Sequence, residues 1–201
     1  MTLRIETDLD KVEQNTRTLV DRLHSSGIRV TGVTKAVLGS PAVGAAMLRG
    51  GAGGLGDSRV ENLARLAGLD RWPLRTLIRS PMLSQVASVV GAADISLNTE
   101  AVVLAALDQA AAEQKRMHAV VLVVELGDLR EGISLDDIPE AVRAVLGHSS
   151  LRLAGLGANL ACQNGVVPDD RNMGVLTRLA DDVEARHGIS LGVVSGATRR
   201  T

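Results

Sequence analysis

Short β-rich runs alternate with amphipathic helical stretches along the whole chain, and this alternation limits the folds open to it. Strands joined by helical crossovers form a parallel sheet with right-handed connections, so the chain is of the α/β class. The runs that predict strands are residues 28–36, 52–57, 74–80, 93–98, 118–126, 151–161 and 191–197. The helical stretches between and around them are residues 8–26, 41–50, 58–69, 80–92, 99–115, 134–148 and 168–188.

Two architectures have this rhythm, an open doubly wound sheet and a (β/α)8 (TIM) barrel. No G-x-G-x-x-G motif follows the first strand, which weakens a dinucleotide-binding fold. A barrel has eight strands and about 250 residues, whereas seven strands are visible here and the last is clipped. No linker or repeat interrupts the pattern, so we expect a single domain over residues 1–201.

The composition excludes several classes of protein. A formal net charge of −1 provides no electrostatic case for binding nucleic acid or a membrane surface. The polar N-terminus does not resemble a signal peptide, and the single cysteine, Cys162, rules out a disulfide framework, so a cytoplasmic location is expected. The chain has no Phe and no Tyr, and its one Trp is Trp72, which predicts an aliphatic core.

In a barrel the reactive groups lie at the carboxyl ends of the strands. Lys35 lies at the carboxyl end of the first predicted strand, whose other residues are mostly apolar, so its stem should lie against the barrel mouth and be partly buried. A neutral amine in such a place can form a Schiff base with an aldehyde, whereas a surface lysine that reaches to solvent is the alternative. The other polar groups at predicted strand ends are Asp57, Ser58, Arg59, Arg79, Ser80, Asn98, Asp128, Arg130, Asn159 and Ser195.

Further polar residues have more than one interpretation. Asp57 and Glu61 are able to face a substrate ammonium or to pair with nearby arginines on a helix. In the stretch GDLREG, Arg130 is either part of a solvated turn or a ligand for an anion such as a substrate carboxylate. Cys162 is expected to be a small packed residue, and the four histidines are expected to be surface or satisfied residues at the opposite ends of the strands: His24, His118, His148 and His187.

Seven short motifs in order resemble the alanine racemase N-terminal-domain family, and in particular its alanine/ornithine racemase-like branch. They are VTKA, GLGDSRVENL, IRSPM, ISLN, VELGDLREGI, GLGANLAC and VVSG, and the resemblance as a whole runs from about residue 3 to residue 196. The resemblance implies a pyridoxal 5′-phosphate (PLP) enzyme on a (β/α)8 barrel that interconverts L- and D-amino acids. In such an enzyme the cofactor is an electron sink, while the protein supplies position and proton transfer.

The resemblance also assigns roles to individual residues. Lys35 matches the lysine that holds PLP as a Schiff base, and it would also act as one of the bases. Arg130 matches an arginine near the cofactor ring, and Asn159 takes the place of a histidine beside that ring. Ser195 and Gly196 begin the loop that holds the cofactor phosphate, where backbone N–H groups suit an anion.

The chain departs from the family pattern in two ways. It has no tyrosine for the second base, which the family takes from a C-terminal β-domain that we do not find here. The phosphate loop, Ser-Gly-Gly-Asn-Ser in the family, reads SGATRRT, and deleting one G from GC-rich codons for the family loop reproduces this ending. We therefore hypothesise a frameshifted barrel that is truncated before strand eight.

Loss of strand eight would leave exposed strand edges, and we expect marginal stability or association with a second copy through these edges. Three functions follow from these observations. The first is a PLP-dependent amino-acid racemase whose small-molecule substrate is alanine, ornithine or another basic amino acid, since nothing in the sequence selects among them. The second is a PLP-binding protein of cofactor homeostasis without turnover, and the third is an inactive remnant.

Overall fold

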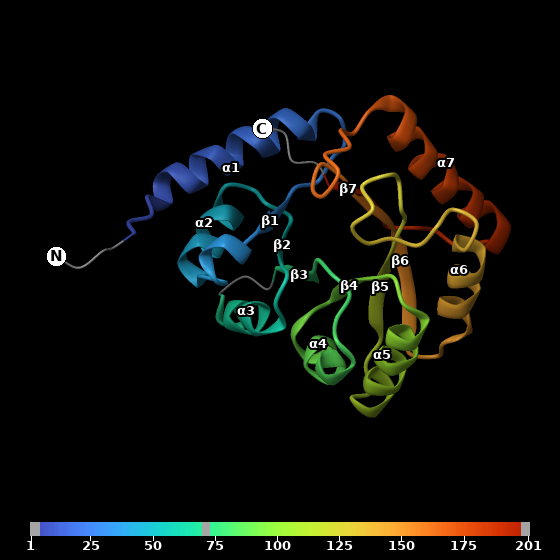
Figure 1. Cartoon of the computed structure of the whole chain (residues 1–201). Coiled ribbons are helices and arrows are strands. Elements are labelled where there is room, and N and C mark those ends of the chain that lie inside the picture. The colour runs from blue at the N-terminus through green and yellow to red at the C-terminus, as the bar shows by residue number, and fades with distance from the viewer. Residues whose placement is uncertain (1–4, 70–72, 198–201) are drawn as a thin grey trace. The chain divides into compact units, whose positions relative to one another are not determined.

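The computed structural model describes residues 5–69 and 73–197, so Trp72 and the last four residues of the SGATRRT ending lie outside it. The chain divides into two compact units, Met1–Ile78 and Arg79–Thr201. In both units strands and helices alternate along the chain (Figure 1). Each unit is a parallel sheet with its own covering helices, and the two are described in turn.

The first unit contains three parallel strands, β1 (Thr31–Val33), β2 (Gly54–Asp57) and β3 (Leu74–Leu77). β2 lies between the other two, so the strands occur in the sheet in their order in the chain. The helices are α1 (Leu9–His24), α2 (Pro41–Arg49) and α3 (Val60–Arg65), with the short 3₁₀ helices η1 (Lys35–Val37) and η2 (Leu66–Gly68).

Local sequence explains where the helices of this unit begin. The carboxylate of Asp8 accepts a hydrogen bond from the backbone N–H of Lys11, 3.0 Å away, and so caps α1. Pro41 is the first residue of α2, where its missing N–H costs nothing. Glu13 on α1 joins the two helices by an ion pair with Arg49 of α2 at 2.8 Å.

The second unit contains four parallel strands, β4 (Ile95–Asn98), β5 (His118–Val123), β6 (Leu151–Asn159) and β7 (Val193–Ala197), which again pair in chain order. Its helices are α4 (Val86–Ala92), α5 (Ala101–Glu113), α6 (Ile138–Gly147) and α7 (Asp170–His187), and the 3₁₀ helix η3 (Leu83–Gln85) precedes α4. Asp169 caps α7 in a reciprocal pair of hydrogen bonds with Asn172.

The core of the second unit is aliphatic on both faces of its sheet. All six residues of β5 are buried, as expected of a parallel strand covered on both sides. On one face Ile95, Ala119, Val121 and Ala154 form a cluster with Leu97 and Val193 packed against it. The prediction of an aliphatic core is therefore confirmed for the part of the chain that the structure describes.

The seven predicted strands and their alternation with helices are confirmed, but several boundaries are wrong. The first strand covers only Thr31–Val33 of the predicted 28–36, because the chain turns into η1 at Lys35. The predicted helix 134–148 begins at Ile138, after a turn in which Ser134 donates to the carboxylate of Asp137 at 2.7 Å. The helix predicted over 80–92 is regular only from Val86.

His118, the first residue of β5, is a satisfied core histidine, as predicted. Its side chain is 1% exposed, and its Nε2 lies 2.9 Å from the hydroxyl of Ser96 on β4. Burial lowers the pKa of His118 from 6.5 to about 4, and Arg116 adds to this effect while Asp94 opposes it. The imidazole is therefore neutral in the folded protein at pH 7.

We expect this histidine to make the protein less stable in mild acid. The pKa of His118 is lower in the folded protein than in the unfolded chain. The contribution of the neutral imidazole to the free energy of unfolding is therefore complete above pH 6.5 and is lost as the pH falls from 6.5 to about 4. The loss should approach about 3 kcal/mol. Urea unfolding at pH 7.5 and pH 4.5 measures it. In His118→Gln the difference between the two pH values should shrink, whereas His187→Gln, on α7, should leave it unchanged; an undiminished difference in His118→Gln would contradict this.

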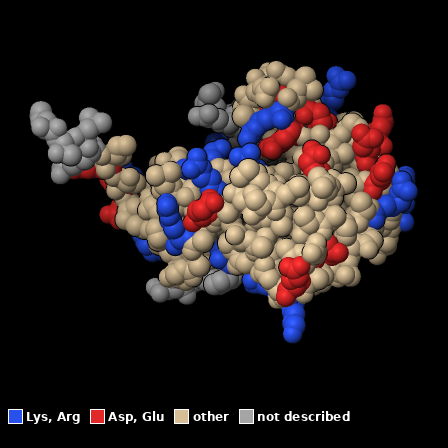
Figure 2. Space-filling model, turned by 60° about the horizontal axis from the view of Figure 1, so that its bottom comes forward, with Lys and Arg blue, Asp and Glu red and all other residues tan. Residues whose placement is uncertain are grey.

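The surface carries no concentration of one charge on the face that Figure 2 shows, where basic and acidic side chains are interspersed. Among the described residues, no helix combines the length and the apolar character needed to cross a membrane.

Candidate functional site

The turn that carries Lys35 lies at the carboxyl end of β1. Thr34 is buried, and Lys35 then begins η1, which is followed by two residues with left-handed backbone, Leu38 at φ 52° and Gly39 at φ 67°. A side chain at Gly39 would meet the carbonyl oxygen of Asn62 at 2.6 Å, so this glycine lets the turn lie against the start of α3. The turn is thus fixed by backbone geometry.

Asp57 supports this turn from the end of β2. Its carboxylate is fully buried and accepts hydrogen bonds from the Thr34 hydroxyl at 2.8 Å and the Asn62 amide at 3.0 Å. It also accepts the backbone N–H of Arg59 at 3.0 Å, rather than pairing with that residue's guanidinium. Asp57 therefore holds the residue next to Lys35 in place, and both of its oxygens are engaged within the unit.

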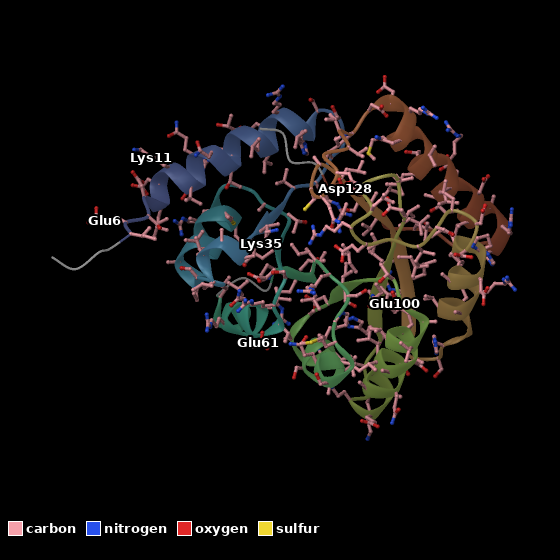
Figure 3. The ribbon with its side chains drawn as sticks, in the orientation of Figure 1. Glu6, Lys11, Lys35, Glu61, Glu100 and Asp128 are labelled. Carbon is pink, nitrogen blue, oxygen red and sulfur yellow. The ribbon has the colours of Figure 1, made fainter. Side chains whose placement is uncertain are left out.

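The side chain of Lys35 is exposed, so the expectation that it is partly buried is wrong. Lys35 follows the short β1 and is the first residue of η1; Figure 3 labels it. Within residues 5–69 and 73–197 no ion pair or side-chain hydrogen bond engages its ammonium. A primary amine on a fixed turn, free of a carboxylate partner, is available to react with a carbonyl compound.

In the second unit, Asn159 and Ser195 lie on the same face of the sheet. Ser195 pairs with Gly157 across β6 and β7, and Gly157 and Asn159 are two residues apart on β6. A Cβ at Gly157 would lie 3.2 Å from Val121 Cγ1 and 3.3 Å from the carbonyl oxygen of Ser195. Because Gly157 has no side chain, no side-chain atoms rise from this face of the sheet next to the Ser195 hydroxyl.

Gly196 lies on the opposite face from Ser195. A Cβ there would come within 2.8 Å of the sulfur of Met173 on α7, so Gly196 permits close packing of that helix. Gly196 therefore lies on the face of β7 that packs against α7. Only its backbone is able to contact a ligand bound next to Ser195.

The loop after β5 is held in place by two carboxylates. Glu125 accepts the backbone N–H groups of Gly127 and Leu129, at 2.5 and 3.1 Å. Asp128 is 1% exposed and accepts three backbone N–H groups of the loop after β6, from Gln163 at 2.8 Å, Asn164 at 3.1 Å and Cys162 at 3.3 Å. These hydrogen bonds, chiefly that from Gln163, lower the pKa of the Asp128 carboxyl.

Two side-chain contacts join the same two loops. Arg130 Nη1 donates to the sulfur of Cys162 at 3.3 Å, and the Asn159 amide donates to Glu131 Oε1 at 2.7 Å. Cys162 is exposed, so the prediction that it is packed is wrong: it lies on the loop held by Asp128 and not under a helix. Arg130 is exposed on the loop after β5, and its role as a ligand for an anion stays a prediction.

In the second unit, Asn159 thus shares a face of the sheet with Ser195 and contacts Glu131, which lies 3.7 Å from Arg130. In the first unit, Asp57 supports the turn that carries Lys35. Sequence reasoning missed the buried role of Asp128 and the Glu131–Asn159 contact. The only signal for Asp128 was its place directly after Gly127 in the stretch GDLREG. Its hydrogen-bond donors are backbone N–H groups that lie 34 to 36 residues further along the chain, so no local pattern indicates them.

Parallel strands that alternate with helices, with a lysine and polar groups at the carboxyl ends of the strands, are the arrangement of the (β/α)8-barrel class. The chain belongs to the family of the alanine racemase N-terminal domain, whose model matches residues 7–198. It is 31% identical over 194 residues to an ornithine racemase of Acetoanaerobium sticklandii and 30% identical over 195 residues to a lysine racemase of Thermotoga maritima. Both matches cover 96% of this chain and 54% of the relative, so the chain spans about half the length of the curated relatives it matches.

Solved structures confirm the fold. Alanine racemase from Streptomyces coelicolor A3(2) matches with a TM-score of 0.82 at 22% identity, covering 94% of this chain and 52% of that one. D-threonine aldolase from Filomicrobium marinum matches with a TM-score of 0.75 at 21% identity, covering 94% and 54%. The predicted α/β barrel class is thus correct.

Proposed function

We propose that this chain carries the PLP-binding part of an amino-acid racemase that interconverts the L and D forms of a basic amino acid. The observation that carries the proposal is Lys35, an exposed amine without a carboxylate partner among the described residues, on a fixed turn at the end of β1. The ornithine and lysine racemases among its relatives support a substrate with an amine on its side chain.

The residues present fit PLP. The Lys35 amine suits the cofactor aldehyde, and Ser195 offers a hydroxyl above the low surface at Gly157, which suits a phosphate. When bound, PLP would supply an electron sink for a carbanion at the substrate α-carbon. Lys35 would hold the cofactor and exchange a proton with the α-carbon, while Arg130, exposed and cationic, would attract the substrate carboxylate.

A second candidate is PLP binding without turnover. The 201 residues contain no tyrosine, the residue type that the family resemblance assigns to the second base. A chain that loads PLP but does not exchange the α-proton of L-ornithine or L-lysine in D₂O would favour this candidate. A cytoplasmic location and association with a second copy remain predictions.

The test of the proposal is to trap the cofactor. The purified chain is incubated with PLP and reduced with borohydride, and the modified peptide is mapped by mass spectrometry. We expect modification confined to Lys35, because its amine is exposed, has no ion-pair partner among the described residues and lies on a fixed turn at the carboxyl end of β1; the adduct should be lost completely in Lys35→Ala.

The matched control is Lys11→Ala, since Lys11 is an exposed lysine on α1 of the same unit that pairs with Asp8 at 3.6 Å (Figure 3). This variant should give the same PLP adduct at Lys35 as the unchanged chain. Modification scattered over several lysines, or none, would refute the proposal and favour the inactive remnant.

A further inference from the structure

The contact between Asn159 and Glu131 fixes which way the Asn159 amide faces. Glu131 Oε1 lies 2.7 Å from the side-chain nitrogen of Asn159. An ionised carboxylate only accepts hydrogen bonds, so the amide must turn its NH₂ group toward Glu131. The amide oxygen of Asn159, Oδ1, is therefore directed away from Glu131.

The atoms left over in this pair are both acceptors. Asn159 Oδ1 and Glu131 Oε2 have no hydrogen-bond partner among the described residues, while Oε1 receives the Asn159 amide and lies 3.7 Å from Arg130. The Glu131 side chain is 21% exposed, so it is partly shielded from water yet accessible. An amide oxygen beside a carboxylate suits a group that only donates.

The pair also has a defined place on the sheet. Asn159 is the last residue of β6, on the face that carries Ser195 on β7, and this face is low at Gly157. Glu131 reaches the same point from the loop after β5, which Asp128 anchors through three backbone hydrogen bonds. A rigid support of this kind suits a residue that selects a ligand.

We propose that Glu131, together with Asn159 Oδ1, binds the side-chain ammonium of a basic amino-acid substrate. A primary ammonium has three donors and no acceptor, which complements the two free acceptors. Arg130, 39% exposed and 3.7 Å from Glu131, lies where it attracts the carboxylate of the same substrate. This inference rests on the proposed function and names the residue that sets its specificity.

The experiment compares two amino acids of matched shape. L-Norvaline has the carbon skeleton of L-ornithine but lacks its side-chain amine. Binding of each to the PLP-loaded chain is measured by titration calorimetry, for the unchanged chain and for Glu131→Gln. Gln can still accept the hydrogen bond of Asn159 but carries no charge, so it tests charge and leaves the contact in place.

We expect the unchanged chain to bind ornithine roughly tenfold or more tightly than norvaline, and Glu131→Gln to bind the two within about threefold of each other. Glu131→Asp, which retains the charge, should still prefer ornithine. Glu140→Gln, an exposed change on α6 of the same unit, should bind as the unchanged chain does.

The outcomes separate this inference from the function on which it rests. If PLP is trapped at Lys35 in both proteins but Glu131→Gln keeps the full preference for ornithine, the assignment of Glu131 is wrong and the proposed function stands. An unchanged chain with no preference between ornithine and norvaline overturns the assignment without any variant. If PLP is not trapped at Lys35 at all, the proposed function fails and the inference fails with it.

Discussion

Replacing Asp57 by Ala should strongly destabilise the first unit, by roughly 3 kcal/mol or more. The change leaves two donors, the Asn62 amide and the backbone N–H of Arg59, without their acceptor, and the Thr34 hydroxyl keeps only its longer hydrogen bond to the carbonyl oxygen of Gly56, at 3.3 Å. Each unsatisfied donor costs about 1–3 kcal/mol. Urea unfolding measures the loss, and the yield of borohydride-trapped PLP at Lys35 should fall with it, because Thr34 precedes Lys35.

Two further variants make this prediction specific. Asp57→Asn should lose less stability, since the amide oxygen still accepts from Arg59 and Asn62, and the Thr34 hydroxyl is able to turn and accept from the amide nitrogen. Asp10→Ala, an exposed change on α1, should have little effect. An Asp57→Ala protein as stable as the unchanged chain would show that this carboxylate does not support the turn.

Replacing Gly155 by Ala should disrupt the pairing of β6 with β7. A Cβ at this position would overlap the backbone carbonyl oxygen of Val193, which no rotation of a side chain relieves. Overpacking usually costs about 1–3 kcal/mol, and we expect the upper end or more, because backbone atoms must move. Ser195 lies two residues beyond Val193, so its hydroxyl should shift as well. Urea unfolding gives the loss of stability.

Gly147→Ala is the matched control for this substitution. Gly147 is the last residue of α6, and a Cβ there meets no atom within 4 Å. Alanine should leave the stability unchanged or raise it by up to about 1 kcal/mol, because it has the higher helix propensity. If both glycine variants unfold at the same urea concentration as the unchanged chain, the close approach of β6 and β7 is not as described.

The class of fold was readable from the sequence because it depends on local patterns. Apolar runs such as HAVVLV and capping residues such as Asp8 act within a few residues, so strands and helices were predicted in the right order. Ends that depend on tertiary contacts were wrong. The first strand stops at Val33 because Thr34 is bound to Asp57, 23 residues away in sequence.

The candidate site was readable only in part for the same reason. The resemblance singled out Lys35, Asn159 and Ser195, and the structure adds which faces of their strands carry the last two. The resemblance did not reveal the role of Asp128, because the partners of this carboxylate are backbone N–H groups, which any sequence provides. The exposure of Lys35 and Cys162 also depends on loop paths that no local pattern encodes.

The order of the strands has a consequence for how the protein folds. Within each unit, every strand pairs with the strand next to it in the chain, so no pairing has to wait for a distant segment. Each pairing therefore closes a single strand–helix–strand crossover rather than a loop that spans the whole unit, which limits its entropic cost. Strands β1 to β3 are therefore able to assemble on the ribosome while the residues after Ile78 are still being synthesised.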